Sequence, residues 1–520
     1  MVFRSPWPDQ GTYEPLTLLQ LIERTVKRLP DKPALCGASG KSYTYAEYWA
    51  GVKGMARHLQ DDGLKKGDVI GIYAPNSVEY AIALHGALMA GAVVTTLNPL
   101  YREREVEHQL ADAGATALFT LEPLKPVVED ARKHLPKLQK VYELENAWAM
   151  AASAAGDPHP VDIDPLNDLA VLPYSSGTTG MPKGVMLTHQ NLTANVRQFV
   201  ATNVLNQSDV TLDILPFYHI YGMAVLLNGG LAQGITQVIM QRFDPEQALS
   251  IIQDHGVTVL FFVPPAVLAL VNHPKLEESD TSTVRMLVSG AAPLPAEIAR
   301  QAQKKLPKCI VMQAYGMTEA SPVTNVNPPE SPRDGTVGPP VPDTLEKVVD
   351  LETDAELPPG EIGELLVFGP QVMKGYWNRP DATAETITAD GWLRTGDIAS
   401  ADADGYVRIH DRKKEMIKYK GYQIAPAELE SVLMEHPDVR DAAVIPKADL
   451  EAGEVPKAFV VAKTGALNLD EVLAFVAERV APYKKIRFIE TVEAIPKNPS
   501  GKILRRQLIE QERALEKERA

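Results

Sequence analysis

Short runs of apolar, β-branched residues recur through roughly the first four-fifths of the chain, and each run ends in turn-forming residues. Segments with the apolar spacing of helices separate them. This alternation predicts βαβ units and a mostly parallel sheet, whose ligands gather in loops at the carboxyl ends of the strands. The runs that carry the prediction begin at Val69, Leu169, Thr211, Val257 and Val284.

The pattern changes twice along the chain. Residues 81–97 are the longest apolar run, and we expect a buried helix followed by a strand there because the run is too short to span a membrane. Between about 335 and 375, glycine and proline punctuate short strands, which predicts an antiparallel, β-rich subdomain. After Asp411, a helix at 426–436 pairs with short strands, as in a small α+β domain.

The predicted fold is therefore α/β, with two domains. A large domain (1–410) contains the βαβ layers and the β-rich subdomain. A small α+β C-terminal domain (411–520) follows it.

Composition narrows the class of protein. The chain has 520 residues, 45% of them hydrophobic, and a net charge of −15. This acidic balance argues against nucleic acid or an anionic membrane as the main partner, and no stretch predicts a transmembrane segment. Two cysteines, Cys36 and Cys309, exclude a disulfide framework and favour a cytoplasmic enzyme.

The strongest chemical signal follows the predicted strand at 169–172. The loop PYSSGTTGMPKGV combines glycines that let backbone amides approach phosphate, hydroxyl donors and one lysine, which predicts triphosphate binding. Its spacing differs from the G-x-x-x-x-G-K-[ST] loop, so it does not indicate cleavage of the γ-phosphate. The candidate ATP-binding residues in it are Ser175, Ser176, Gly177, Thr178, Thr179, Gly180 and Lys183.

Five further blocks follow this loop in the order found in the adenylate-forming superfamily, which includes acyl- and aryl-CoA ligases, luciferases and amino-acid adenylation domains. The sequence resembles that family over nearly its whole length. HIYG and KYKGYQIAPAELE look closest to 4-coumarate:CoA ligases and luciferases. The five blocks are SGAAP (289–293), QAYGMTE (313–319), GWLRTGD (391–397), DRKKEMIKYKGYQ (411–423) and PKNPSGKILRR (496–506).

The resemblance implies an ATP-dependent carboxylate:CoA ligase. Such an enzyme joins an organic acid to AMP with release of pyrophosphate, and then passes the acyl group to the thiol of CoA. ATP, Mg²⁺ and CoA are the implied cofactors, and a small carboxylic acid is the implied substrate.

The same resemblance assigns roles to residues. Lys502 would stabilise charge developing between the acid and the α-phosphate, Thr318 would contact that phosphate, and Glu319 would help to hold Mg²⁺. Asp397 and Arg412 would bind the ribose. The remaining implied nucleotide contacts are Gly290, Ala291, Ala292, Gln313, Tyr315 and Gly316.

For transfer to CoA, the resemblance implies that rotation about Asp411 replaces the Lys502 loop with the KYKGYQ segment. We expect this segment to be a β-hairpin as well. Its implied CoA-binding residues are Lys418, Lys420, Gly421 and Gln423.

The resemblance implies that His219, which follows a predicted strand, is a catalytic residue and also the first residue of the acid pocket. Gly316 would leave the pocket open, so the acid should be larger than propionate. An apolar Val225 cannot form a hydrogen bond with the hydroxyl of a phenol. Cinnamate-like acids and medium- or long-chain fatty acids therefore remain equally plausible substrates. The implied pocket residues are His219, Tyr221, Val225, Ala291, Gly316, Pro322 and Val323.

Two other functions share the ATP-binding blocks. An amino-acid adenylation domain would present an aspartate to the substrate ammonium within 216–225, and no aspartate occurs there. A luciferase-like enzyme would need oxygen chemistry, which no residue specifically indicates.

Overall fold

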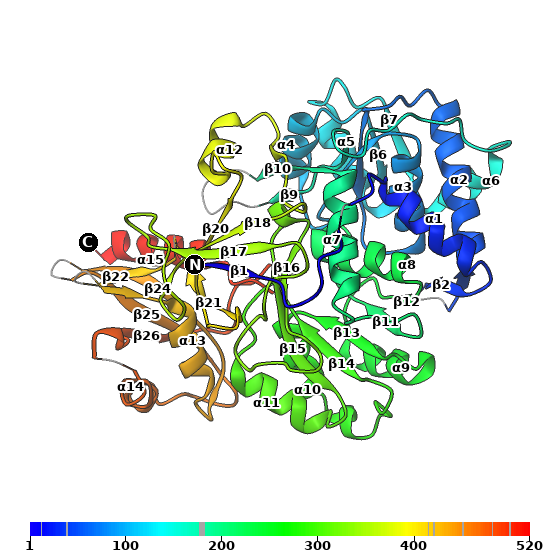
Figure 1. Cartoon of the computed structure of the whole chain (residues 1–520). Coiled ribbons are helices and arrows are strands. Elements are labelled where there is room, and N and C mark those ends of the chain that lie inside the picture. Colours follow the sequence, from blue (N-terminus) through cyan, green and yellow to red (C-terminus); the bar gives the residue numbers. More distant parts are fainter. Residues whose placement is uncertain are drawn as a thin grey trace.

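The computed structural model describes residues 1–11, 13–37, 40–175, 182–413, 415–419, 422–449, 452–480, 482–498 and 501–519, with the side chains of 422–423 and 515–519 left aside. It is an α/β protein built around four sheets (Figure 1). No helix in these ranges is both long enough and apolar enough to cross a membrane.

Two eight-stranded sheets form the N-terminal part, where the hydrophobic pattern predicted one mostly parallel sheet. The first has the order β19 (Gly375–Tyr376), β10 (Lys183–Thr188), β8 (Leu169–Val171), β5 (Val93–Leu97), β4 (Val69–Tyr73), β6 (Ala117–Thr120) and β7 (Lys140–Glu143), with β9 (Tyr174–Ser175) paired to β10. The second has the order β16 (Val323–Val326), β15 (Ile310–Gly316), β14 (Met286–Ser289), β13 (Val259–Phe262), β11 (Val210–Asp213), β12 (Thr236–Ile239), β2 (Pro33–Cys36) and β3 (Ser42–Thr44).

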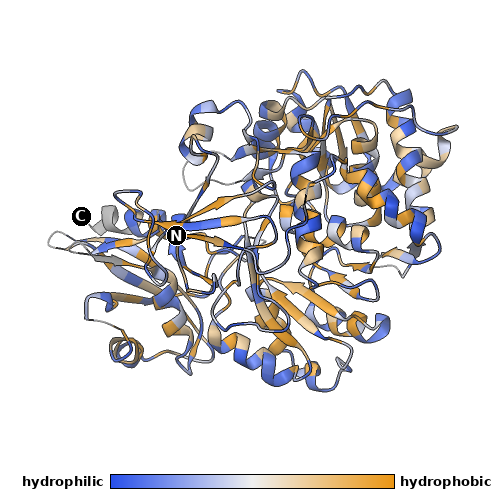
Figure 2. Ribbon diagram, in the orientation of Figure 1, coloured by the Kyte–Doolittle hydropathy of each residue, from blue (hydrophilic) through white to orange (hydrophobic). Residues whose placement is uncertain are grey.

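Parallel pairing runs through the middle of both sheets, as the apolar runs predict. Strands β4, β5, β13 and β14 are buried along their whole length, because helices cover both faces of a parallel sheet. Figure 2 shows β13 and β14 almost uniformly apolar, whereas the surrounding helices mix apolar and polar faces. The predicted helix-then-strand within 81–97 is confirmed as the end of α3 (Val78–Met89) followed by β5.

Helices surround these sheets. Threonines cap several of them, and Thr44 accepts the backbone N–H of Glu47 while the Glu47 carboxylate accepts that of Thr44. The helices of this part are α1 (Leu18–Arg28), α2 (Tyr45–Asp61), α3, α4 (Glu103–Ala113), α5 (Lys125–Arg132), α6 (Ala147–Ser153), α7 (His189–Ala201), α8 (Gly230–Gln233), α9 (Pro245–His255), α10 (Pro264–Val271) and α11 (Ala296–Lys305), together with the π-helix η3 (Tyr221–Gly229).

The predicted β-rich region is a five-stranded antiparallel sheet. In Figure 1 it lies between the large sheets and the C-terminal strands. The short helix α12 (Pro380–Thr386) precedes its fourth strand. Its order is β1 (Val2–Arg4), β17 (Leu345–Val349), β18 (Gly363–Phe368), β20 (Leu393–Ala401) and β21 (Val407–Arg412).

The C-terminal sheet buries both faces. Along β24 (Val439–Asp449), Ala442 and Val444 face the helices α13 (Pro426–Met434) and α14 (Leu469–Ala477), whereas Ala443 and Ile445 face α15 (Arg505–Arg519). The other strands are β22 (Ile417–Tyr419), β23 (Tyr422–Ile424), β25 (Gly453–Ala462) and β26 (Phe488–Thr491). The expected hairpin is present as β22 and β23. The boundary at 410/411 and the hinge stay predictions.

Candidate functional site

A cavity of about 890 Å³ opens where several strands of both large sheets end. Asn98 follows β5, Gly290 follows β14, and Gly316 is the last residue of β15. Because these are carboxyl ends of strands with parallel partners, the loops that carry the sequence blocks converge on one space.

The cavity collects most of the predicted site residues that the structure describes. Among these residues, Ala292, Gln313, Val225, Asp397 and Lys418 do not line it. The loop residues 176–180, together with Lys420 and Gly421, lie outside the described part of the chain, as does the Gln423 side chain. The predicted residues that line it are Ser175, Lys183, His219, Tyr221, Gly290, Ala291, Tyr315, Gly316, Thr318, Glu319, Pro322, Val323, Arg412 and Lys502.

Glu319 is a buried carboxylate in the short 3₁₀ helix η5 (Thr318–Ala320). Its Oε1 accepts hydrogen bonds from Ser175 Oγ and from Tyr376 Oη, each at 2.8 Å. Its Oε2 accepts none from any described residue. One oxygen is therefore fixed by the protein and the other remains for a ligand.

Tyr376 belongs to this site, although sequence reasoning did not include it. It lies on β19, which pairs with β10, so Tyr376 comes beside Lys183. The Lys183 ammonium lies 5.0 Å from the centre of the Tyr376 ring. Only pairing between strands far apart in the chain reveals this contact.

Asp397 and Arg412 form an ion pair at the cavity wall, in which Asp397 is buried and Arg412, which lines the cavity, is partly exposed. They are register partners on β20 and β21, and Arg412 Nε lies 2.7 Å from Asp397 Oδ1. The hydroxyl of Tyr315 donates to Asp397 Oδ2. Burial raises the pKa of Asp397, although Arg412 and Tyr315 act to lower it. Three predicted residues from three strands thus form one unit.

Lys502 reaches the cavity from a tight turn in the C-terminal region. Gly501 adopts φ +79°, and a Cβ there would lie 2.7 Å from Cδ of Pro265, so a side chain would prevent this close approach. The Asn498 side chain accepts the backbone N–H of Lys502 at 2.8 Å. Burial lowers the pKa of Lys502, and nearby Arg412 lowers it further.

Close packing shapes the apolar side of the cavity. A Cβ on Gly316 would lie 2.1 Å from the carbonyl oxygen of Pro322, and one on Gly290 would lie 2.9 Å from the ring of Tyr221. The Tyr221 hydroxyl is buried and has no hydrogen-bond partner among the described residues. Burial lowers the pKa of His219 to about 4, which keeps its imidazole neutral at pH 7.

Three of the predicted residues that do not line the cavity have other positions. Val225 is 2% exposed, packs within the hydrophobic core on η3 and does not line the cavity. The influence of Val225 on the choice of acid stays a prediction. Gln313 accepts the backbone N–H of Leu294 at 2.7 Å and so fixes the loop after β14. Lys418 is exposed on β22.

A polar arm of the same cavity was not predicted. Thr96 and Asn98 line it at the end of β5, and Thr96 Oγ1 donates to the carbonyl oxygen of Tyr218 at 2.7 Å. Gln109 of α4 donates to Thr95 Oγ1 at 2.9 Å and to the carbonyl oxygen of Thr96 at 3.0 Å, which holds this wall in place. Asn98, a polar residue directly after the strand at 93–97, was the feature of the sequence that could have indicated this part of the cavity.

Comparison with known proteins gives two matches to family models. Residues 22–377 match the AMP-binding enzyme model, and residues 428–502 match the model of the AMP-binding enzyme C-terminal domain. A 4-coumarate–CoA ligase of Pinus taeda is 41% identical over 98% of this chain and 97% of its own length.

Solved structures show the same likeness. ATP-bound MatB from Rhodopseudomonas palustris has a TM-score of 0.88 at 31% identity, covering 95% of this chain and 99% of that one. The anthranilate CoA ligase AuaEII in complex with anthranoyl-AMP has a TM-score of 0.89 at 26% identity, covering 95% and 97%.

Proposed function

From its membership of the AMP-binding enzyme family, to which this chain belongs, we propose that it activates an aromatic acid of the cinnamate or coumarate kind. The chain is an ATP-dependent acid–CoA ligase. ATP, CoA and a small carboxylic acid are its substrates.

The first reaction joins acid and nucleotide. A carboxylate oxygen of the acid attacks the α-phosphorus of ATP, the bond to the bridging oxygen breaks, and pyrophosphate leaves. Lys502 and Thr318 line one cavity together with Gly290 and Gly316. This shared position supports their role at the α-phosphate. Arg412 and Asp397 would hold the ribose.

Mg²⁺ fits Glu319. A carboxylate oxygen is a hard ligand of the kind that Mg²⁺ prefers, and Oε2 of Glu319 accepts no hydrogen bond from a described residue. Bound there, the ion would neutralise phosphate charge. Ser175 and Tyr376 would keep the carboxylate turned towards it.

The second reaction needs a thiol to reach the acyl carbon. The CoA sulfur attacks that carbon, the bond to the AMP oxygen breaks, and AMP leaves. Thr96, Asn98 and Gln109 line the same cavity as His219, and their polar side chains would suit the amides of a pantetheine chain. Rotation about Asp411 and CoA contacts from Lys418, Lys420, Gly421 and Gln423 remain part of the proposal.

The observation that carries the aromatic acid is the likeness to 4-coumarate–CoA ligases, of which that of Pinus taeda is 41% identical over 98% of this chain. Gly316, Pro322 and Tyr221, three of the predicted pocket residues, line the same cavity as Lys502. Medium- and long-chain fatty acids are the second candidate.

The test is pyrophosphate release and thioester formation across a panel of acids, with and without CoA. We expect the highest kcat/KM with cinnamates. Preference for fatty acids would overturn the aromatic acid, and activation of amino acids would overturn the ligase.

We also propose a cytoplasmic location. Cys36 and Cys309 are both buried and unpaired, as in proteins of reducing compartments.

A further inference from the structure

Glu364 is a buried carboxylate to which the sequence blocks assign no role. It lies on β18 and is 3% exposed. Its Oε2 lies 2.9 Å from Lys413 Nζ and 3.3 Å from Arg394 Nη1, so one carboxylate oxygen forms ion pairs with two cations. A carboxylate removed from water is costly unless it is paired, and the two cations supply that pairing here.

The two cations flank the Asp397–Arg412 pair. Lys413 directly follows Arg412, and its backbone N–H donates to the carbonyl oxygen of Gly396 at 2.8 Å. Arg394 lies three residues before Asp397 on the same strand, β20. Glu364 therefore ties together the two segments that carry the pair, from a third strand.

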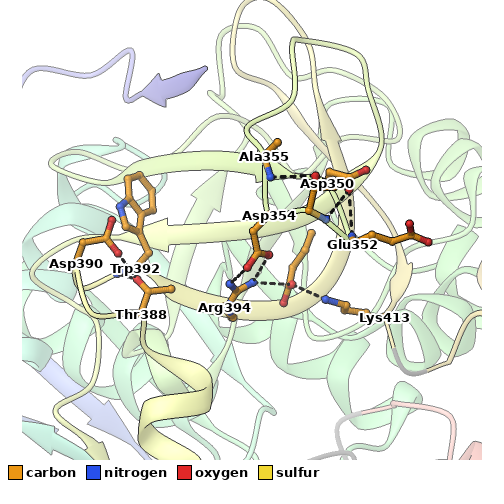
Figure 3. Close-up of polar contacts among 11 residues, drawn as sticks. Asp350, Glu352, Asp354, Ala355, Thr388, Asp390, Trp392, Arg394 and Lys413 are labelled. Carbon is orange, nitrogen blue, oxygen red and sulfur yellow. Dashed lines mark hydrogen bonds and ion pairs between the residues drawn. The ribbon is translucent and has the colours of Figure 1, made fainter.

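Arg394 has a second anion on its solvent side (Figure 3). Its Nη1 and Nη2 reach the two oxygens of Asp354 at 3.0 and 2.5 Å. Asp350 orders this turn, because its Oδ1 accepts the backbone N–H of Glu352 at 3.1 Å. Asp354 is 56% exposed, so water screens this pair far more than the pair with Glu364.

We propose that Glu364 is a positioning residue for the nucleotide. It anchors Arg394 and Lys413 to the cavity wall and so fixes Asp397 and Arg412 in the geometry that receives the ribose. This inference rests on the proposed function only in taking the cavity as the nucleotide site. Glu364 acts through the two cations and is not a catalytic residue.

Charge alone makes the opposite prediction. Replacing Glu364 by glutamine removes a negative charge near the cavity, and simple attraction would then strengthen the binding of an anion such as AMP. Loss of positioning weakens it instead. The direction of the change therefore separates the two explanations.

The experiment measures AMP binding to the full chain by calorimetry. We expect Glu364→Gln to weaken binding by about tenfold or more, in the range typical of residues that orient ligand-binding groups. In turnover, KM for ATP should rise while KM for the acid stays unchanged. Unchanged or tighter AMP binding would overturn the inference.

Two variants remove the same charge elsewhere. Asp354→Asn frees only the exposed side of Arg394 and should weaken AMP binding less than Glu364→Gln does. Asp402→Asn breaks an exposed pair with Arg333 on the same sheet and should leave it unchanged. Equal losses in Glu364→Gln and Asp402→Asn would contradict a specific role for Glu364.

Lys413→Met provides a second route if Glu364→Gln does not fold. It should also weaken AMP binding, and the double variant should be no weaker than Glu364→Gln alone, because both changes break one linkage. Additive losses, or no loss in Lys413→Met, would overturn the inference. These results do not depend on the acid panel, so the inference and the choice of acid fail separately.

Discussion

The nucleotide side and the acid side of the cavity are built in different ways. On the nucleotide side, charged groups are held by partners: Asp397 by Arg412 and Tyr315, and Glu319 by Ser175. On the acid side, backbone and rings in close contact form the walls, as at Gly316.

This difference indicates which side of the cavity governs adenylate formation and which side governs the choice of acid. A paired charge has a defined position and loses its effect when the partner is removed, so changes on the nucleotide side should affect all acids alike. A packed wall sets shape, so changes on the acid side should affect acids according to their size.

The strongest test of the nucleotide side is Lys502→Ala. Adenylate formation, measured as pyrophosphate release, should fall by at least about 100-fold for every acid, because one group that stabilises transition-state charge is lost. Thioester formation from supplied acyl-AMP should remain largely intact.

Lys497→Ala is the matched control. Lys497 belongs to the same segment, but it pairs with Asp441 at 2.7 Å and does not line the cavity among the described residues. Its loss should leave adenylation unchanged. Equal loss of both half-reactions in Lys502→Ala would remove the proposed role.

Gly316→Ala tests the acid side with a smaller effect. The added Cβ would meet the Pro322 carbonyl oxygen at 2.1 Å, so the backbone of one of these two lining segments must shift. We expect kcat/KM for cinnamates to fall by about 10- to 100-fold, in line with the cost of overpacking. Small acids and AMP binding should be less affected.

Val225→Ala is the control for that variant. It removes apolar volume from the core beside the pocket, so it should lower the free energy of unfolding without changing the ranking of acids. A changed order of kcat/KM among the acids in Val225→Ala, or an equal loss of kcat/KM for all acids in Gly316→Ala, would contradict the proposed difference between the nucleotide side and the acid side.

Glu346→Gln should have the smallest effect on catalysis, because Glu346 is buried on β17 and does not line the cavity. Burial raises its pKa to about 8, although Asn325 acts to lower it. Between about pH 4.5 and about pH 8 the Glu346 carboxyl is protonated in the folded protein but ionised in the unfolded chain. The free energy of unfolding therefore falls as the pH rises through this range.

Thermal unfolding across this range checks the prediction. The wild-type Tm should decline more steeply with pH than that of Glu346→Gln, with the largest gap near pH 8, while kcat stays unchanged. Parallel pH profiles of the two proteins would contradict it.

Much of the fold follows from local pattern. The buried runs at 69–73 and 286–289 are strands because apolar, β-branched residues fit a parallel sheet covered on both faces. The phosphate-binding character of the loop that ends at Lys183 was also readable from its residue types, whereas the roles of Glu319 and Lys502 came from the resemblance to a known family. Such features depend on neighbours within a few residues.

The remaining features of the fold and the site depend on the tertiary structure. It divided the parallel strands into two sheets, brought Tyr376 to Glu319, buried Val225 in the core, and set Glu364 between Arg394 and Lys413. Each of these outcomes depends on the pairing or packing of segments far apart in the chain. Local periodicity states which face of a strand is apolar, but it does not state which strand lies beside it. The sequence by itself therefore determined the elements and the reactive groups, and strand pairing and packing determined which groups meet.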